Sequence, residues 1–228
     1  MLVGDLARFS ESLLADDDPR PVIAVPELLL PETLDRLLLR VYGSELMPGQ
    51  LPVLVSQWSK YYFMQIIPPL VVAVLVQGWR GTLELDQVVF ALDERGVLDG
   101  VRFLEAGGCR VGEWGEPFER FGFLLDHLQQ VIEVLSVYGG VVPGVLWGNA
   151  GDYLETCLTQ LAQVSDVPLD AGLVLLHERI RPDGRRNPLF NAITYIEGPN
   201  GLRRQRRTCC LSHRVEWVGR CEHCPLIE

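Results

Sequence analysis

The sequence lacks several features that would assign a protein to a class at once. Its first residues, Met1 to Asp5, contain no basic stretch followed by an apolar run, so we expect no secretory signal. We therefore expect a cytoplasmic protein in a reducing environment, with peripheral contact to the inner membrane left open. No G-x-G-x-x-G motif follows an expected strand, which argues against a nicotinamide or flavin site of its own.

Basic residues are also scarce. The chain has 20 lysines and arginines against 30 aspartates and glutamates, a formal net charge of −10. Such an acidic chain argues against a nucleic-acid partner, because binding to phosphates depends on clustered positive charge. The one basic region is residues 198–228, where six arginines stand against three glutamates.

Apolar residues, by contrast, are abundant at 48% of 228 residues, which predicts an ordered chain with a sizeable core. The longest apolar segment, from Tyr61 to Trp79, is nearly long enough to span a bilayer. Pro68-Pro69 lies in its middle, and Gln65 and Gln77 interrupt it. We therefore expect two buried helical pieces that meet at a proline kink.

The apolar spacing predicts an α+β fold, with a helix-rich body, a small antiparallel sheet and a loop-rich C-terminal segment. Spacings of three and four favour helices, and short alternating runs favour strands. We expect residues 1–185 to form the body and 186–228 the C-terminal segment, together one compact unit. The expected helices are 1–16, 31–41, 51–77, 121–135, 147–161 and 170–180, and the expected strands are 83–92, 101–103 and 192–196, with a turn at 93–96.

Four of the six cysteines lie close together near the C-terminus, as Cys209-Cys210, ten residues, and then Cys221-Glu222-His223-Cys224. Thiolates at such spacing are typical ligands of a metal ion or an iron–sulfur cluster. Neighbouring side chains in extended backbone point to opposite sides, so the adjacent pair favours two bridged irons over one zinc ion. A structural zinc site and disulfides remain alternatives on spacing alone. Cys109 and Cys157 are isolated from this group.

Further motifs accompany the cysteines. The cysteine pattern follows Arg206-Arg207-Thr208 and precedes Pro225-Leu226, and other motifs lie upstream in the chain. From about residue 51 to the end, the sequence resembles the ferric siderophore reductase (FhuF) family. The upstream motifs that carry the resemblance are SQWSKYYF (56–63), continuing into IPP (67–69), LWGNA (146–150) and NPLF (187–190).

The resemblance implies an oxidoreductase acting on metal ions, which reduces siderophore-bound Fe(III) to Fe(II) by one electron and releases iron in the cytoplasm. It implies a [2Fe–2S] cluster on Cys209, Cys210, Cys221 and Cys224, with no catalytic residue beyond the cluster. The partners would be a ferric siderophore and a separate ferredoxin-like or flavoprotein electron donor. The alternative is a non-catalytic, synthetase-like siderophore-binding module with a structural Zn(Cys)4 site.

Two groups of residues are candidates for electrostatic or substrate contacts. The arginines beside the cysteines could favour the reduced cluster or attract an anionic partner, or they could simply form a solvated basic turn. Trp58 and Lys60 could line a siderophore pocket on the body, or Trp58 could pack in the core. The arginines in question are Arg203, Arg204, Arg206 and Arg207.

Overall fold

The structure is a computed structural model, and it describes residues 4–79, 81–104, 115–198, 201–216 and 218–227. Cys109 lies outside these ranges. About half of the chain is helical, and the predicted α+β class is confirmed. The helices are α1 (Val25–Leu28), α2 (Pro31–Tyr42), α3 (Met47–Leu75), α4 (Pro117–Arg120), α5 (Gly122–Gly139), α6 (Pro143–Ala162) and α7 (Asp170–His177).

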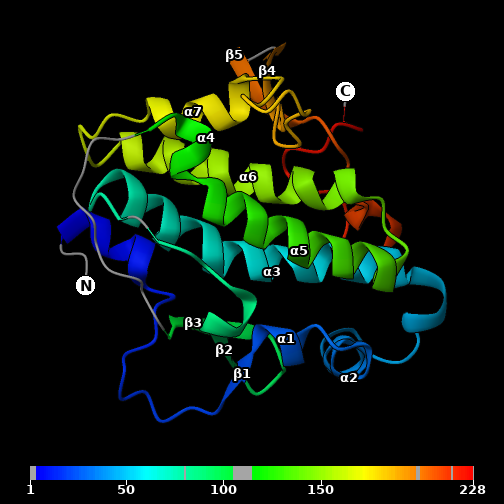
Figure 1. The fold of residues 1–228 in the computed structure, drawn as a ribbon. Helices are drawn as coiled ribbons and strands as arrows, with labels where there is room; N and C mark the ends of the chain where they lie inside the picture. The colour runs from blue at the N-terminus through cyan, green and yellow to red at the C-terminus, as the bar shows by residue number, and fades with distance from the viewer. Residues whose placement is uncertain (1–3, 80, 105–114, 199–200, 217, 228) are drawn as a thin grey trace.

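The body is organised around α3, which packs against α5 and α6 (Figure 1). Trp58, Tyr62, Phe63 and Ile66 of α3 are all fully buried. Most side chains in its second half are apolar and buried, so that half of α3 lies largely in the core. None of the helices in the described ranges is both long enough and apolar enough to cross a membrane.

The two helical pieces expected on either side of Pro68-Pro69 form one helix, because α3 continues through both prolines to Leu75. A proline inside a helix removes the N–H that would bind the carbonyl four residues earlier. For Pro69 that carbonyl belongs to Gln65, and the Ser12 hydroxyl donates to it over 3.4 Å. The unpaired carbonyl is thus satisfied from another segment, which lets the helix continue.

Within the described residues, strands β1 (Val22–Ala24), β2 (Val88–Leu92) and β3 (Leu98–Phe103) form an antiparallel sheet in that order. The predicted turn joins β2 to β3. Its Asp93 carboxylate accepts the backbone N–H groups of Arg95 and Val97, each over 2.8 Å. Gly96 has φ of 84°, a conformation that favours glycine. Strand β1 was not predicted, because its three residues lie among prolines.

The C-terminal part begins with a hairpin of β4 (Ile193–Gly198) and β5 (Gly201–Arg206), and then continues into the cysteine-bearing segment beside α3 and α6 (Figure 1). Strand β5 was not predicted, since this region was expected to be loop-rich with one short strand at 192–196. The start of the chain differs as well, since the expected helix over 1–16 is a 3-10 helix at Gly4–Ser10. Further 3-10 turns lie at Leu85–Gln87 and Ser212–Arg214. The division of the chain at residue 185 stays a prediction.

Candidate functional site

The four C-terminal cysteines lie on two loops that follow β5. Cys210 and Cys224 are buried, whereas Cys209 and Cys221 are half-buried. Leu211 has φ of 67°, so the chain reverses direction directly after the adjacent pair. All four are free thiols in the structure, and each loop therefore offers one shielded and one more accessible sulfur.

Backbone groups point at two of these sulfurs. The N–H of Leu211 donates to Cys209 Sγ over 3.3 Å, and the N–H of Leu226 donates to Cys224 Sγ over 3.4 Å. Such bonds stabilise a negatively charged sulfur, which is the form that binds metals. The loop geometry therefore supports thiolates at both ends of the motif.

The two loops also meet each other. The Cys210 and Cys221 thiols are hydrogen-bonded, which lowers the pKa of Cys210 and raises the pKa of Cys221. The positive charge of Lys60 favours the thiolate at both sites, although burial opposes it. Burial also raises the pKa of Cys209. Two thiols in contact would both be deprotonated only with a cation beside them, because adjacent thiolates repel each other.

The donor set fits a [2Fe–2S] group, because four thiols from two adjoining loops are the ligands such a group takes. The residues that would hold it are Cys209, Cys210, Cys221 and Cys224. Across the ranges that the structure describes, no group of three or more His, Cys, Asp or Glu is arranged to hold a single metal ion.

Helix α3 forms hydrogen bonds to the backbone of the first cysteine loop. Ser56 Oγ and Gln57 Nε2 both donate to the carbonyl oxygen of Cys210, over 2.9 and 2.8 Å. From α6, Asn149 Nδ2 donates to the Ser56 carbonyl over 2.9 Å and to Ser59 Oγ over 3.0 Å. The motifs at 56–63 and 146–150 thus meet in space. The sequence indicated these segments but not that their polar side chains position the cysteines.

Two of the four candidate arginines bind the C-terminal segment to α6, and a third links two parts of that segment. Arg206 is 2% exposed and donates to Asp152 of α6 over 2.6 Å and to Asn149 Oδ1. Arg204 forms ion pairs with Asp152 and Glu155. Arg203 donates to the carbonyl of Ile227 over 2.8 Å.

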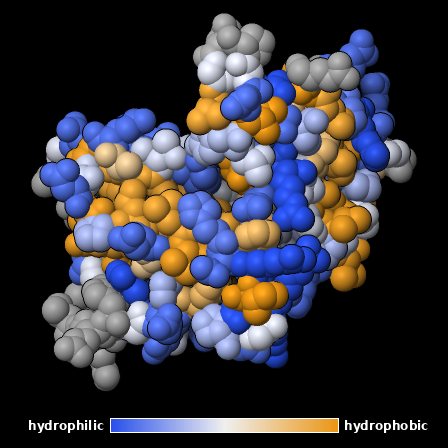
Figure 2. Space-filling model, turned by 90° about the horizontal axis from the view of Figure 1, so that it is seen from above, coloured by the Kyte–Doolittle hydropathy of each residue, from blue (hydrophilic) through white to orange (hydrophobic). Residues whose placement is uncertain are grey.

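The fourth arginine, Arg207, is exposed and lies over the Phe190 ring, with 6.0 Å from its Cζ to the ring centroid. Figure 2 shows the face that carries the β4–β5 hairpin, where hydrophilic side chains form a band between apolar areas. Among the four arginines, Arg207 is the one whose side chain is most available to a partner on this surface.

Trp58 and Lys60 are separated by the structure. Trp58 is fully buried in the core, so its side chain has no surface to offer a substrate. Lys60 is half-buried, and its Nζ donates to Gln57 Oε1 over 2.8 Å. Gln57 therefore contacts both groups, the Lys60 ammonium through Oε1 and the Cys210 carbonyl through Nε2.

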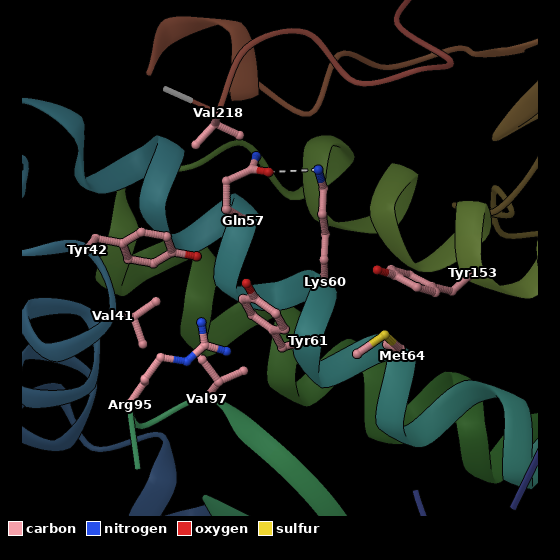
Figure 3. A pocket seen from close by; sticks show the side chains of 10 residues that line it. All are labelled: Val41, Tyr42, Gln57, Lys60, Tyr61, Met64, Arg95, Val97, Tyr153 and Val218. Carbon is pink, nitrogen blue, oxygen red and sulfur yellow. Dashed lines mark hydrogen bonds between the residues drawn. The ribbon is translucent and has the colours of Figure 1, made fainter. Parts of the chain in front are cut away.

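Lys60 lines a pocket of about 380 Å³ beside the cysteine loops (Figure 3). The pocket draws side chains from α2, α3, the β2–β3 turn, α6 and the loop before Cys221. Sequence reasoning missed Tyr153 and Arg95, because only the fold brings them near Lys60. Burial raises the pKa of Tyr153 to about 12, so its phenol is a neutral hydrogen-bond donor.

The comparisons with known proteins agree with this geometry. Residues 56–200 match the sequence model of the family described as ferric iron reductase FhuF-like transporter, and residues 206–226 match the FhuF 2Fe-2S C-terminal domain. A curated relative, the ferric siderophore reductase of Escherichia coli (strain K12), is 24% identical over 221 residues, which cover 92% of this chain and 82% of the relative. The chain therefore belongs to the FhuF family of ferric iron reductases, and its C-terminal segment is a [2Fe–2S] domain of the type that family carries.

Proposed function

We propose that the protein reduces siderophore-bound Fe(III) to Fe(II) by transfer of one electron and so releases iron in the cytoplasm. The substrate class follows from the name of the Escherichia coli relative, a ferric siderophore reductase. Siderophores bind Fe(III) through hard oxygen donors, which hold Fe(II) far more weakly. Addition of one electron to the metal therefore releases it without cleavage of the chelator.

The chain's own residues would supply three parts of this process. Cys209, Cys210, Cys221 and Cys224 would hold the [2Fe–2S] group, which when bound exchanges single electrons at low potential. Ser56 and Gln57 fix the Cys210 backbone, and the half-buried Cys209 and Cys221 lie nearest to solvent. The electron would come from a separate ferredoxin-like or flavoprotein donor, since the substrate iron gains one electron and the donor loses one.

The observation that carries the proposal is the position of the pocket. Gln57 and Lys60 both line it, and Gln57 Nε2 donates to the Cys210 carbonyl over 2.8 Å, so the pocket lies beside the first cysteine loop. A chelate bound there would lie beside the electron source. The pocket is smaller than a whole siderophore, so it would accept part of the complex and leave the rest in solvent.

The test replaces one ligand at a time. Cys209→Ala and Cys221→Ala remove a sulfur from each loop and should reduce Fe(II) release from a ferric siderophore at least 100-fold, as measured by a coloured Fe(II) chelator. Cys157→Ala is the matched control, because Cys157 lies buried on α6 and burial raises the pKa of its thiol to about 12.

A second readout is independent of turnover. Protein purified without oxygen should be red-brown, should bleach with dithionite, and should contain nearly equal iron and acid-labile sulfide. Both alanine variants should lose this spectrum, and the control should keep it. Wild-type turnover in Cys209→Ala, or a colourless protein with stoichiometric zinc, would overturn the proposal in favour of the binding module.

A further inference from the structure

The pocket beside the cysteine loops has an unusual charge for this protein. The chain carries a net charge of −10, yet the pocket is lined by two cationic side chains, Lys60 and Arg95. None of the described residues that line it carries a carboxylate. Lys60 is also the only lysine in the sequence. A positive pocket in an acidic chain indicates a ligand of negative charge.

The two cations come from different parts of the fold. Lys60 projects from α3, and Arg95 projects from the β2–β3 turn on the other side of the pocket (Figure 3). Arg95 Nε faces Asp93 at 3.2 Å, which leaves the two terminal nitrogens of the guanidinium available to a ligand. The Arg95 side chain is 79% exposed, so it can adjust to ligands of different size.

Neutral hydrogen-bond donors complete the lining. Tyr42, Tyr61 and Tyr153 all contribute to the pocket. Burial raises the pKa of Tyr42 and of Tyr153, so neither phenol is negatively charged at neutral pH. Phenol hydroxyls and aromatic faces suit a planar, oxygen-rich chelating group, whose outer oxygens accept hydrogen bonds.

The position of Lys60 has a further electrostatic effect. An anionic complex that approaches Cys210 and Cys221 meets negative sulfurs, and like charges at close range repel each other strongly where water is excluded. The ammonium of Lys60 lines the pocket and donates to Gln57 Oε1 over 2.8 Å, and the amide nitrogen of the same Gln57 donates to the Cys210 carbonyl over 2.8 Å. The ammonium therefore lowers the repulsion between the thiolates and an anionic ligand.

We propose that this pocket selects ferric chelates of net negative charge, such as tris-catecholate or carboxylate-bearing complexes, over neutral tris-hydroxamates, with Lys60 and Arg95 contacting the anionic oxygens. The inference rests on the proposed function for the identity of the metal complex. It goes beyond that function because it names the charge class that the site prefers.

Binding can be measured separately from reduction. Ga(III) has the charge of Fe(III) and forms the same type of chelate, but it is not reduced under these conditions. Isothermal titration calorimetry on the full, anaerobically purified chain would compare Ga(III) complexes of a hexadentate tris-catecholate, a citrate-based carboxylate–hydroxamate and a neutral tris-hydroxamate. We expect the anionic complexes to bind at least tenfold tighter than the neutral one, and the difference to shrink at high salt.

Substitutions assign the preference to the two cations. Lys60→Met and Arg95→Gln should each weaken binding of the anionic complexes about tenfold, the effect of losing one hydrogen bond to a charged group. The neutral complex should be unaffected, and Lys60→Arg should restore most of the anionic preference. Arg185→Gln is the matched control, because Arg185 also lies two residues after an aspartate, 3.8 Å from Asp183, and is 82% exposed, but it lines no part of this pocket.

The single lysine allows a direct second measurement. Acylation of primary amines can modify only Lys60 and the N-terminal amine, and mass spectrometry separates the two. The anionic Ga(III) chelate should slow acylation of Lys60 at least fivefold and leave the N-terminal amine unchanged. The neutral chelate at the same concentration should not protect Lys60.

The outcomes distinguish the two levels of inference. Equal binding of neutral and anionic complexes, equal loss of both in Lys60→Met, or no binding of any complex would overturn the charge preference. If Fe(III) in neutral chelates were nevertheless reduced in a cysteine-dependent way, the proposed function would stand without it. Anionic binding with no reduction of the Fe(III) form would support the charge preference and contradict the proposed function.

Discussion

The helical body and the cysteine-bearing part of the C-terminal segment are stabilised in different ways. This part, residues 206–227, is the segment compared with the body below. Apolar side chains from α3, α5 and α6 fill the body, many of them fully buried. In the described part of the segment, the buried residues are Arg206, Cys210, Ser212, Val215 and Cys224, of which Val215 alone is a hydrocarbon. The segment therefore depends mainly on buried polar contacts and on its thiols, whereas the body depends mainly on the burial of apolar side chains.

Substitution of Arg206 should produce the largest difference in local stability between the two regions. Arg206→Met removes the ion pair with Asp152 and leaves Asn149 Oδ1 without its donor. Loss of one partner of a buried pair costs several kcal/mol, so we expect the segment to lose about 3 kcal/mol of local stability. Hydrogen exchange should accelerate about 100-fold in 206–227 and stay unchanged in α3 and α5.

Arg207→Met provides the comparison for that experiment, because Arg207 is the next residue, is exposed and donates to the Phe190 carbonyl over 3.2 Å. Its exchange rates should remain within about twofold of wild type, as expected of an exposed polar contact. Equal acceleration throughout the body in Arg206→Met would show that the two regions unfold as one unit.

The second prediction concerns the body alone. His127 is fully buried between the Tyr62 hydroxyl, at 2.6 Å, and the Leu83 carbonyl, at 3.3 Å, and burial lowers its pKa from 6.5 to about 4. The unfolded chain takes up a proton first as pH falls, so stability is lost from about pH 6.5 downward to about pH 4. The full loss amounts to about 3 kcal/mol.

Urea unfolding followed by circular dichroism between pH 4.5 and 7.5 would measure this slope. His127→Gln should flatten it, whereas His177→Gln, at the exposed end of α7, should leave it unchanged. An unchanged slope in His127→Gln would mean that another group carries the acid sensitivity of the body.

The smallest expected effect lies at the boundary between the two regions. A Cβ on Gly148 of α6 would lie 3.1 Å from Thr208 Cβ, next to Cys209, whereas a Cβ on Gly144 would meet nothing within 4 Å. Gly148→Ala should therefore destabilise the segment by about 1 kcal/mol through overpacking. Gly144→Ala should stabilise α6 by up to about 1 kcal/mol. Thermal melts, with the cluster spectrum recorded alongside, would detect both, and a stabilised Gly148→Ala would show that Thr208 yields without cost.

Sequence reasoning succeeded where one local signal dominates. The helices over 121–135 and 147–161 follow from apolar spacing, and the 93–96 turn follows from Asp93 and Gly96. It failed where a residue far away in the sequence stabilises the local structure. The Ser12 hydroxyl satisfies a carbonyl freed by Pro69, and carboxylates on α6 hold the arginines of β5 along the edge of the body.

The candidate site shows the same division. The four cysteines were indicated by their spacing, and their role as cluster ligands stays a prediction. Lys60 was also indicated as a candidate pocket residue, but Arg95 and Tyr153 were not, because they lie 35 or more residues from Lys60 in the sequence and approach it only in the folded chain. For Trp58 the sequence left a pocket position and a core position open, and the structure places it in the core.

Ser56, Gln57 and Lys60 lie within little more than one turn of α3. The first two fix the Cys210 backbone, and the third lines the pocket. At a rise of about 1.5 Å per residue, a helix sets the spacing of such groups rigidly. Tunnelling of an electron falls off exponentially with distance, so under the proposed function α3 would fix the separation between the sulfurs and a chelate in the pocket. A loop in its place would let that separation fluctuate, and the rate of electron transfer would fluctuate with it.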